Sequence, residues 1–560
     1  MNRISHKLTF SLAIYTALIF QTAHAAELDA SGLFYQEQEF HIPANAESMI
    51  LADMNGNGLN DIVVPVDDKI RIYFHNETGF DFETGFDEIQ FPGEAVGWDI
   101  STAADDNTSV IVALIDGREV VSWQIGNGNI HDAETLKSGL SGFISRGVNR
   151  LHFSQDINND GNRDLIIPGA GQLNLYISDG SGGFEDSIAV QSTVRIRSNL
   201  NSNELERRTG QAIRIPSMDL RDVNNDELPD LISRSDERLD VFLANDTDTS
   251  YFPREASYSL DIEEIESRLG EFDIDNLDFS NLTGVLALTH EEILDDVDGD
   301  NIDDLLLREG GKVSLYSGTK QGMDFEQPRQ VLRSGGNVLS TFLYDENEDE
   351  LKDLWLWRVE PISVGDIFLW LALSGSISIE AFVYPNEGER FSRRPARKLN
   401  IKLKFPSVIR LATSVREITE VARENQIQDS SLSVTANLDD NLQREDLLVM
   451  INNRIDIFLN SIEPEADKDL FLGSLGYSRQ RDDYEIDIKE ILDNVSIQNN
   501  PHLEAVADRE ASFSITLNNN MESGDIIPAK LNRDSYDDVF IFSGQDSSHI
   551  RGLLLLSSEN

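Results

Sequence analysis

Short apolar runs recur along the whole chain, and most of them come directly after a polar, acidic segment. Examples are residues 62–66, 165–167 and 539–542, which are rich in Val, Ile, Leu and Phe. Runs of this length, bounded by turns that contain Gly and Asn, predict β-strands rather than helices. The pattern therefore predicts a protein built mainly from short strands.

Four such strands form one unit, and the unit repeats. In the first unit we expect strands at 48–52, 61–66 and 70–74 and a fourth strand that ends near Phe91. Four-stranded units that repeat every 45 to 90 residues, roughly, are typical of a β-propeller. We therefore predict an all-β fold, a propeller of eight four-stranded blades, or of seven if one weak unit is wrongly divided. The expected blades lie near 47–92, 97–140, 146–195, 212–262, 286–333, 337–404, 430–488 and 511–560.

The two ends of the chain complement each other in this pattern. The last unit stops after a third strand at 553–556, whereas residues 32–43 look like a single fourth strand with no partners before it. We predict that residues 33–42 complete the last blade. This pairing would close the ring and remove an exposed sheet edge.

The polar segment between the first and second strands carries oxygen-bearing side chains at positions 1, 3, 5 and 9, as in Asp53 to Asp61. Calcium prefers six to eight oxygen ligands in flexible geometry, so this spacing predicts a calcium loop. Position 12 is not a carboxylate, which excludes an EF-hand. The expected ligands of five strong loops are Asp53, Asn55, Asn57, Asp61, Asp156, Asn158, Asp160, Asp164, Asp222, Asn224, Asp226, Asp230, Asp296, Asp298, Asp300, Asp304, Asp345, Asn347, Asp349 and Asp353.

Two further loops depart from the pattern. One has candidate ligands at Asn437, Asp439, Asn441 and Glu445. The other begins with Lys530, whose ammonium group would replace the ion. We therefore expect about five calcium sites and two sites that are weak or empty.

The repeated unit resembles the FG-GAP/VCBS repeat. It reads Asp-x-Asp/Asn-x-Asp/Asn-x-x-x-Asp-Leu, and a strand, a Tyr/Phe-rich strand and a Gly/Asn turn follow. This repeat is known from the β-propellers of integrin α-chains and from many exported bacterial proteins. The resemblance covers nearly all of residues 26–560 and implies calcium in the loops. It also implies partner binding on the face opposite the calcium.

Residues 1–25 read as a signal peptide, with Arg3 and Lys7 before an apolar core and Ala23-His-Ala25 as the cleavage site. We therefore expect an exported protein: periplasmic, at the cell surface or secreted. Removing this peptide takes the formal net charge from −54 to −56, which argues against binding to nucleic acid or to anionic membranes. The chain has no cysteine and therefore no disulfide framework.

Longer segments interrupt the units. Helical insertions follow Tyr258 and Tyr484, whose surrounding sequences match each other, so we expect both blades to end alike. Residues 364–373 form an apolar insertion, and we interpret 367–383 as a buried helix and a strand rather than a membrane span. Loops that join strands one and two share a face with those that join strands three and four. We therefore expect calcium on one face and the insertions on the other.

No motif of a catalytic site is present. The seven histidines outside the signal peptide lack metal or triad spacing, and no Gly-x-Ser-x-Gly or His-Glu-x-x-His occurs. The one basic run contains Arg390, Arg393, Arg394 and Arg397, which would bind an acidic ligand or pair with the protein's own carboxylates. We predict a non-catalytic module that binds a protein or a glycan, an adhesion or assembly role. The alternative is a lyase-like enzyme acting on polysaccharide, with the arginines holding uronate groups.

Overall fold

The computed structural model describes most of the chain after the N-terminal segment. The described residues are 25–28, 33–46, 48–102, 109–126, 129–142, 152–199, 210–245, 250–271, 273, 277–407, 409–410, 431–439, 441, 443–451, 454–462, 478–488, 506, 508–516, 525–545 and 548–557. Within these residues the strands form eight sheets of four or five strands and one two-stranded sheet. The predicted signal peptide lies outside the described residues, except for Ala25.

The first four sheets follow the chain in order, and we number them by that order. Sheet one contains β3 (Ile50–Ala52), β4 (Asp61–Val66), β5 (Lys69–Tyr73) and β6 (Phe86–Gln90). Sheet two contains β7 (Ala95–Thr102), β8 (Ser109–Ile115), β9 (Glu119–Gly126), β10 (Asn129–Ile130) and β11 (Glu134–Lys137). Sheet three contains β12 (Ser154–Gln155), β13 (Asp164–Gly169), β14 (Gln172–Tyr176) and β15 (Ile188–Gln191). Sheet four contains β18 (Ser217–Arg221), β19 (Asp230–Arg234), β20 (Arg238–Phe242) and β21 (Tyr258–Asp261), and it is preceded by the hairpin β16 (Arg195–Asn199) and β17 (Gly210–Arg214).

Sheet five also follows the chain in order, whereas the strands of sheets six, seven and eight are not all consecutive. Sheet five contains β22 (His290–Asp295), β23 (Asp304–Glu309), β24 (Lys312–Tyr316) and β25 (Gln330–Arg333). Sheet six contains β26 (Asn337–Tyr344), β27 (Asp353–Val359), β28 (Gly375–Tyr384), β29 (Arg397–Phe405) and β33 (Asp483–Asp487). Sheet seven contains β30 (Ser431–Ala436), β31 (Glu445–Ile451), β32 (Arg454–Ile462) and β34 (Phe513–Thr516). Sheet eight contains β35 (Ile526–Ala529), β36 (Asp538–Gln545), β37 (His549–Ser557), β2 (Leu33–Pro43) and β1 (Ala25–Leu28).

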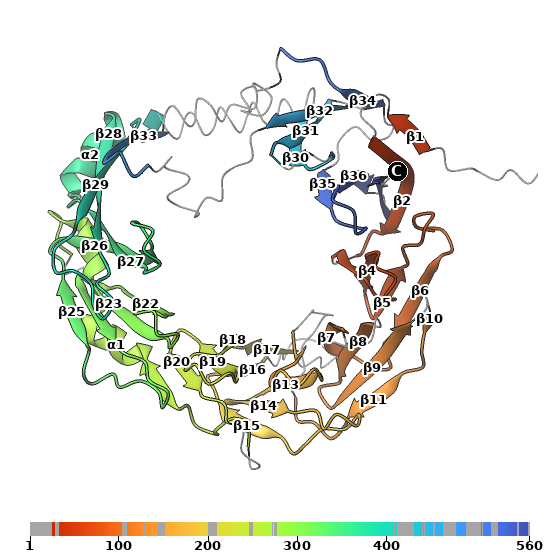
Figure 1. Cartoon of the computed structure of the whole chain (residues 1–560), viewed down its shortest axis with the longest axis horizontal. Coiled ribbons are helices and arrows are strands. Elements are labelled where there is room, and N and C mark those ends of the chain that lie inside the picture. The colour runs from red at the N-terminus through yellow and green to blue at the C-terminus, as the bar shows by residue number, and fades with distance from the viewer. Residues whose placement is uncertain are drawn as a thin grey trace, which may run out of the picture.

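Together these sheets form a β-propeller-like all-β fold, with the sheets following one another around a ring (Figure 1). The second strand of each sheet is an apolar run because both of its faces are covered. All six residues of β4 and of β13 are buried, for example. Hydrophobic clusters lie between neighbouring sheets: Ile62 of sheet one and Phe540 of sheet eight share one cluster, and Val63 and Trp98 share the next. Packing between consecutive sheets thus supplies most of the core.

Strand β2 joins the last sheet of the chain, as predicted for residues 33–42. It pairs antiparallel with β37 from Tyr35, opposite Ser557, to Pro43, opposite His549. Phe40 of β2 lies 5.6 Å from Phe540 and 5.3 Å from Phe542, measured between ring centroids. The N-terminal strand is therefore held by both ladder hydrogen bonds and aromatic packing.

The end of sheet seven differs from the prediction. We expected the segment beginning at Tyr484 to be the last strand of the blade at 430–488, by analogy with Tyr258. Instead β33 joins sheet six as a parallel partner of β29, with Ile401 opposite Tyr484. The fourth strand of sheet seven is β34, which pairs with β32. The expected boundary at 511 was therefore wrong, because β34 belongs to sheet seven and sheet eight starts at Ile526.

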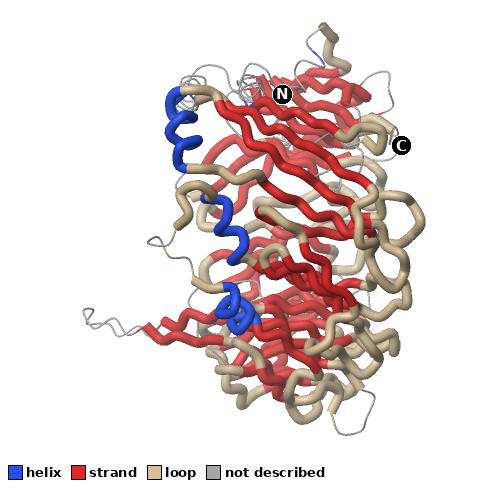
Figure 2. The backbone as a smooth tube through the Cα atoms, turned by 90° about the vertical axis from the view of Figure 1, so that its left-hand side faces the viewer, coloured by secondary structure: helices blue, strands red, loops and turns tan. Residues whose placement is uncertain are grey.

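The helices gather along one edge of the ring (Figure 2). They are α1 (Ile262–Leu269), η2 (Leu282–Leu288) and α2 (Val364–Ala372). In sheet four, Phe242 pairs with Leu231, next to the loop that ends at Asp230. Asp261 pairs with Arg238 at the other end of the same strand, so helix α1, which follows Asp261, starts at the end remote from the loop. Helix α2 likewise follows Val359, the end of β27 that is remote from Asp353. The described helices therefore lie opposite the loops between first and second strands, as expected, whereas the helical insertion predicted after Tyr484 falls outside the described residues.

Helix α2 differs from the expectation of a buried helix. A capping box starts it, since the Ser363 hydroxyl accepts a hydrogen bond from the Asp366 amide and the Asp366 carboxylate accepts one from the Ser363 amide. No residue of the helix is buried, although Ile367 to Leu371 are all apolar. An apolar sequence of this kind usually indicates a core helix, but here the helix stands outside the sheet on which it is anchored.

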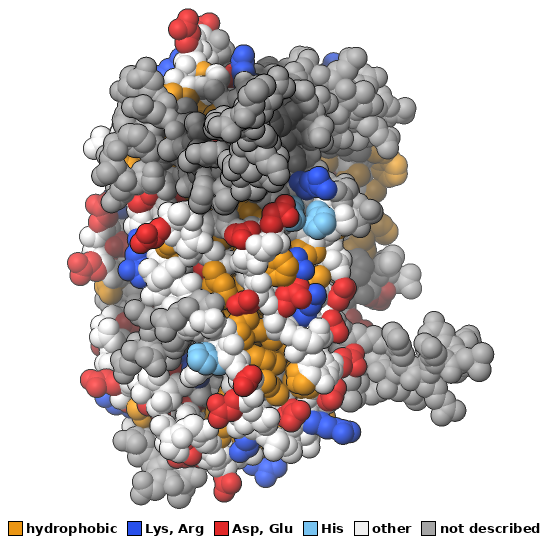
Figure 3. Space-filling model, turned by 90° about the vertical axis from the view of Figure 1, so that its right-hand side faces the viewer, with side chains coloured by type: hydrophobic (Ala, Val, Ile, Leu, Met, Phe, Trp, Pro, Cys, Tyr) orange, Lys and Arg blue, Asp and Glu red, His pale blue; other side chains and the backbone are white. Residues whose placement is uncertain are grey.

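Acidic side chains are spread over the outer surface, as the net charge of −54 requires (Figure 3). Among the described residues, no helix is long and apolar enough to cross a membrane.

Candidate metal sites

The five strong loops all join the first strand of a sheet to its second strand. They connect β3 to β4, β12 to β13, β18 to β19, β22 to β23 and β26 to β27. This is the position predicted from the sequence. Because equivalent connections lie at the same end of every sheet, the five loops share one face of the ring.

The aspartate at position 1 organises each loop. In the first loop, Asp53 Oδ1 accepts hydrogen bonds from the Gly56 and Asn57 amides at 2.8 and 3.2 Å, and Oδ2 accepts one from Gly58 at 2.7 Å. Asp222 and Asp345 accept the corresponding amides of their own loops. The same side-chain positions thus build the same turn from different sequences.

The backbone is also the same in all five loops. Positions 4 and 6 have left-handed φ angles throughout, for example 73° and 87° at Gly56 and Gly58. Where the sequence lacks glycine the conformation persists, with φ of 63° at Glu348 and 71° at Glu350. Non-glycine residues adopt this region at an energetic cost, so the surrounding interactions must impose it.

The aspartate at position 9 fastens the loop to its sheet. Asp61 is fully buried, and its two carboxylate oxygens accept hydrogen bonds from the amides of Met54 at 2.8 Å and His75 at 2.7 Å. Asp230 makes the same pair of bonds, to Val223 and Ala244. Each oxygen retains a second lone pair, so these bonds leave room for a cation.

The loop in sheet seven corrects one predicted ligand. The residue that takes the position 9 role there is Asp446, not Glu445: Asp446 is fully buried and accepts hydrogen bonds from the amides of Leu438 and Asn460 at 2.7 and 2.6 Å. Because this loop is one residue longer than the others, the aspartate that corresponds to position 9 comes one residue later than the pattern predicts. A signal for Asp446 was present in the sequence, since each position 9 aspartate directly precedes an apolar run.

The loop in sheet eight is held by its own lysine. Lys530 Nζ donates a hydrogen bond to the Ser535 carbonyl at 2.6 Å and lies 3.1 Å from an oxygen of Asp537. These contacts agree with the interpretation that the ammonium group takes the place of an ion.

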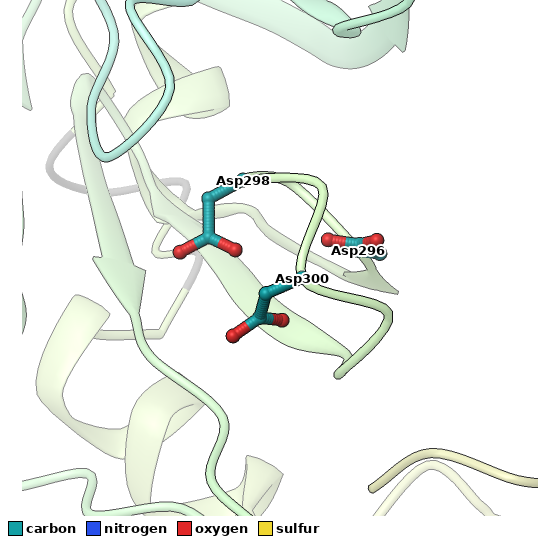
Figure 4. Close-up of side chains that lie close together, drawn as sticks. All are labelled: Asp296, Asp298 and Asp300. Atoms are coloured by element: carbon teal, nitrogen blue, oxygen red, sulfur yellow. The ribbon is translucent and has the colours of Figure 1, made fainter. Parts of the chain in front are cut away.

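The loop in sheet five has the densest charge. Asp296, Asp298 and Asp300 each offer one carboxylate oxygen, and these atoms lie within 4.8 Å of one another (Figure 4). The sequence did not predict that Arg329, just before β25, donates hydrogen bonds to Asp298 and to Asp304, the latter at 3.1 Å. Arg329 is therefore an internal cation among the candidate ligands of this loop, where it would compete with a bound metal ion.

We expect Arg329→Met to tighten calcium binding at the sheet five loop by about tenfold, because a fixed positive charge is removed from within a few ångströms of the ligands. Isothermal titration calorimetry of the variant and of the unchanged protein would measure this. Arg333→Met, which changes a nearby arginine on β25, is the control. Unchanged affinity in Arg329→Met would contradict the competition.

Two buried polar atoms next to these loops have no partner in the described part of the structure. Asn224, at position 3 of the sheet four loop, is 3 % exposed, and its Oδ1 accepts no hydrogen bond. The Tyr251 hydroxyl is also buried without a partner. Burial raises the pKa of Tyr251, and the nearby carboxylates of Asp230, Asp226 and Asp156 raise it further. An unpaired buried oxygen is costly, and a hard cation would satisfy Asn224 Oδ1. The donor set of this loop thus fits calcium.

Neighbouring loops are hydrogen-bonded to one another. The amide at position 8 reaches the carbonyl at position 2 of the preceding sheet's loop, from Asp303 to Val223 at 2.9 Å and from Asn60 to Leu531 at 2.6 Å. These bonds join the loops of sheets four and five and those of sheets eight and one directly.

Burial raises the pKa of every position 9 carboxyl group for which a value is resolved: to about 7 for Asp61 and to about 6 for Asp164, Asp230, Asp304, Asp446 and Asp538. The folded state therefore holds these protons more tightly than the unfolded state, whose carboxyl groups titrate near pH 4. The tighter binding of these protons stabilises the folded state. The stabilisation is fully present below about pH 4 and is lost as the pH rises through about 6 to 7.

We therefore expect the metal-free protein to unfold at a higher temperature at pH 5 than at pH 8. Saturating calcium should abolish or reverse this difference, because protons and calcium compete for the same carboxylates. Thermal unfolding followed by circular dichroism, in chelator and in calcium, measures both slopes. A metal-free protein that is more stable at pH 8 than at pH 5 would contradict this expectation.

The basic run lies on the loop face rather than on the insertion face. It occupies the connection between β28 and β29, next to the loops, because Asn386 donates hydrogen bonds to the carbonyls of Val297 and Lys352. Arg397 is engaged by Glu346 at 2.8 Å and Asp482 at 2.7 Å, and Arg390 by Glu387 at 3.1 Å. Arg393 and Arg394 are exposed. Two of the four predicted ligand-binding arginines are thus paired with the protein's own carboxylates.

No protein-family model matches the chain, and no curated protein matches it. Among solved structures, the chain is similar to a lectin of Agrocybe aegerita that recognises non-reducing terminal N-acetylglucosamine, at 13 % identity and a TM-score of 0.28, covering 65 % of this chain and 81 % of the lectin. It is also similar to BBS1N in complex with ARL6DN, at 11 % identity and TM-scores of 0.20 and 0.18 in lead-soaked and mercury-soaked crystals, covering 58 % of this chain and 94 % of that one.

Proposed function

We propose that this protein is an exported, calcium-binding β-propeller of eight blades, of the FG-GAP/VCBS type, that binds a protein or a glycan and has no catalytic activity. In this proposal each four- or five-stranded sheet is one blade. Calcium rigidifies the loop face, and the insertion face carries the partner. The signal peptide directs the chain to the periplasm, the cell surface or the medium.

The observation that carries the proposal is the identical construction of five loops with different sequences. All five combine the same carboxylate-to-amide bonds with left-handed backbone at positions 4 and 6. Side-chain-to-amide bonds hold each turn, and a common ion would explain why five separate loops keep oxygen-bearing side chains at the same positions. The unpaired Asn224 Oδ1 supplies a donor for that ion in sheet four.

A binding role is supported by the separation of the two faces. The loops are short and mutually hydrogen-bonded, whereas the opposite face carries the helices and an exposed apolar segment. Such elaboration of one face of a rigid scaffold is typical of recognition surfaces. The lyase alternative is weakened because Arg390 and Arg397 already have acidic partners, which leaves Arg393 and Arg394 of the run for an acidic substrate.

Affinity capture tests the proposed role. The tagged protein would be incubated with an envelope extract in calcium, washed, and eluted with chelator. A stoichiometric protein or a polysaccharide in the eluate would support a binding role. New ultraviolet absorbance from unsaturated products, after incubation with acidic polysaccharides, would instead establish the lyase and overturn the proposal.

A further inference from the structure

Helix α2 and its C-cap residue Leu373 expose apolar side chains over a broad part of the helix surface. Phe368 is 66 % exposed, Leu369 57 % and Leu373 60 %, and Ile367 and Leu371 are exposed as well. Successive residues of a helix point about 100° apart, so Ile367, Phe368, Leu369 and Leu371 cover roughly half of the helix surface rather than one narrow stripe. On the remaining side Trp370 packs edge-on against Phe405 of β29, at 5.0 Å between ring centroids. A flat protein partner would cover only one side of such a helix. A fluid apolar medium would cover all of its exposed positions.

A second element extends the apolar surface. Phe279, from the insertion before sheet five, is 61 % exposed and lies beside α2, because its carbonyl accepts a hydrogen bond from the Val364 amide at 2.9 Å. Two further bonds tie these insertions together, from the Leu282 amide to Ile362 and from the Thr283 hydroxyl to Glu360. The apolar patch, defined as α2 with Phe279 and Leu373, is therefore a fixed feature of the insertion face.

An open pocket of about 550 Å³ lies directly beside the patch. Trp370 of α2 contributes to it, as do Lys402 and Lys404 of β29. Its other charged residues are Glu360, Asp366 and Asp487. The pocket therefore presents both ammonium and carboxylate groups at the border of an apolar surface.

We propose that the apolar patch and this pocket form a docking site for a phospholipid surface with zwitterionic headgroups. The side chains of α2 enter the boundary between headgroups and acyl chains, Lys402 binds the phosphate, and the carboxylates bind the headgroup ammonium. Lys404 is already paired with Glu485 of β33. An anionic surface is disfavoured by the net charge of −54. Aromatic and lysine side chains at the rim suit an interface that is apolar on one side and wet on the other.

The geometry sets the depth of contact. Helix α2 has nine residues and therefore rises about 13 Å, far less than the hydrocarbon core of about 30 Å. The protein thus lies on the surface through α2 and does not cross it. This inference does not rest on the calcium proposal, because none of its residues belongs to the loops.

Trp370 provides a specific probe. The chain has five tryptophans, and Trp98, Trp123, Trp355 and Trp357 are all buried, at 5 % exposure or less. Quenching of fluorescence by phosphatidylcholine brominated on its acyl chains would therefore report on α2. We expect quenching and a blue shift with such vesicles for the full chain, in calcium and in chelator alike.

Two variants make the test specific. We expect the double variant Phe368→Ser and Leu369→Ser to bind phosphatidylcholine vesicles about tenfold more weakly, since two exposed apolar side chains no longer enter the bilayer. Lys402→Gln should weaken binding by about fivefold. Ile527→Ser, which removes a comparably exposed apolar side chain from sheet eight, is the control and should bind like the unchanged protein. The unchanged protein and all variants carry the same N-terminal sequence with its apolar core. Differences in vesicle binding among them therefore report on the substituted residues and not on that segment.

Three results would overturn the proposal. The first is the absence of quenching at vesicle concentrations that saturate known peripheral proteins. The second is binding that requires anionic lipid. The third is protection of Trp370 from aqueous quencher without vesicles, accompanied by a concentration-dependent increase in mass, which would assign the patch to a second copy of this chain. If the protein binds vesicles but shows no calcium binding, the proposed calcium-binding function is contradicted and the lipid-docking proposal stands.

Discussion

Removal of calcium by a chelator is expected to lower the unfolding temperature of the protein by several degrees or more. A site saturated at a hundred times its dissociation constant contributes about 2.7 kcal/mol to the free energy of unfolding. Several such sites would supply a large share of the 5–15 kcal/mol or so that is usual for a folded protein. The expected effect is large because the chain has no disulfide to hold it in the absence of the ion.

Differential scanning calorimetry in calcium, in chelator and in chelator with magnesium measures this effect. Magnesium should restore little of the lost stability, because it requires near-octahedral geometry and keeps its waters. It also controls for screening of the net charge of −54 by any divalent cation. An unfolding temperature that is the same with and without chelator would show that the loops are not calcium sites.

Asp538→Ala is expected to lower the free energy of unfolding by about 3 kcal/mol, equally in calcium and in chelator, since it leaves buried amides unpaired. Asp538 is fully buried, and its carboxylate accepts hydrogen bonds from the Leu531 amide at 2.7 Å, the Ser557 amide at 2.7 Å and the Ser557 hydroxyl at 2.9 Å. It thereby joins β36 to the end of β37, which pairs with the N-terminal strand. Its loop contains Lys530 in place of a ligand, so no bound ion should contribute.

Asp226→Ala is the matched variant. Asp226 is exposed at position 5 of the sheet four loop, and its carboxylate accepts a hydrogen bond from the Leu228 amide at 3.0 Å. This variant should destabilise the protein by about 2–3 kcal/mol in calcium, through loss of one site, and little in chelator. Urea unfolding of both variants in both conditions separates the two roles. Equal calcium dependence of the two variants would contradict the division into structural and ligating aspartates.

Local sequence determined the strands, the loops and the closing pair. The loops were predictable because an aspartate or asparagine side chain bonds to amides two to five residues away, so the pattern contains its own geometry. The second strands were predictable because burial on both faces demands an apolar run. The closure by residues 33–42 followed from counting strands, since a ring leaves no place for an unpaired fourth strand.

Tertiary structure alone decided several other features. The segments at Tyr258 and Tyr484 have similar sequences, yet β21 pairs within sheet four and β33 crosses to sheet six. Strand propensity is local, whereas the choice of pairing partner depends on which edge is within reach. The insertion of Arg329 into the sheet five loop joins it to Asp304, 25 residues away, and also left no local signal.

Helix α2 shows the limit of hydrophobicity as a guide to burial. Its sequence predicted a helix and a strand within residues 367–383, because the apolar run is local, whereas the start of the helix at the Ser363 capping box was not predicted. Whether an apolar helix is covered depends on the elements packed around it, and at α2 the sheets are already packed against each other and the helix projects from their edge. The sequence therefore determined what each segment forms, and the arrangement of the sheets decided what each segment touches, because contacts between distant segments depend on chain topology rather than on local pattern.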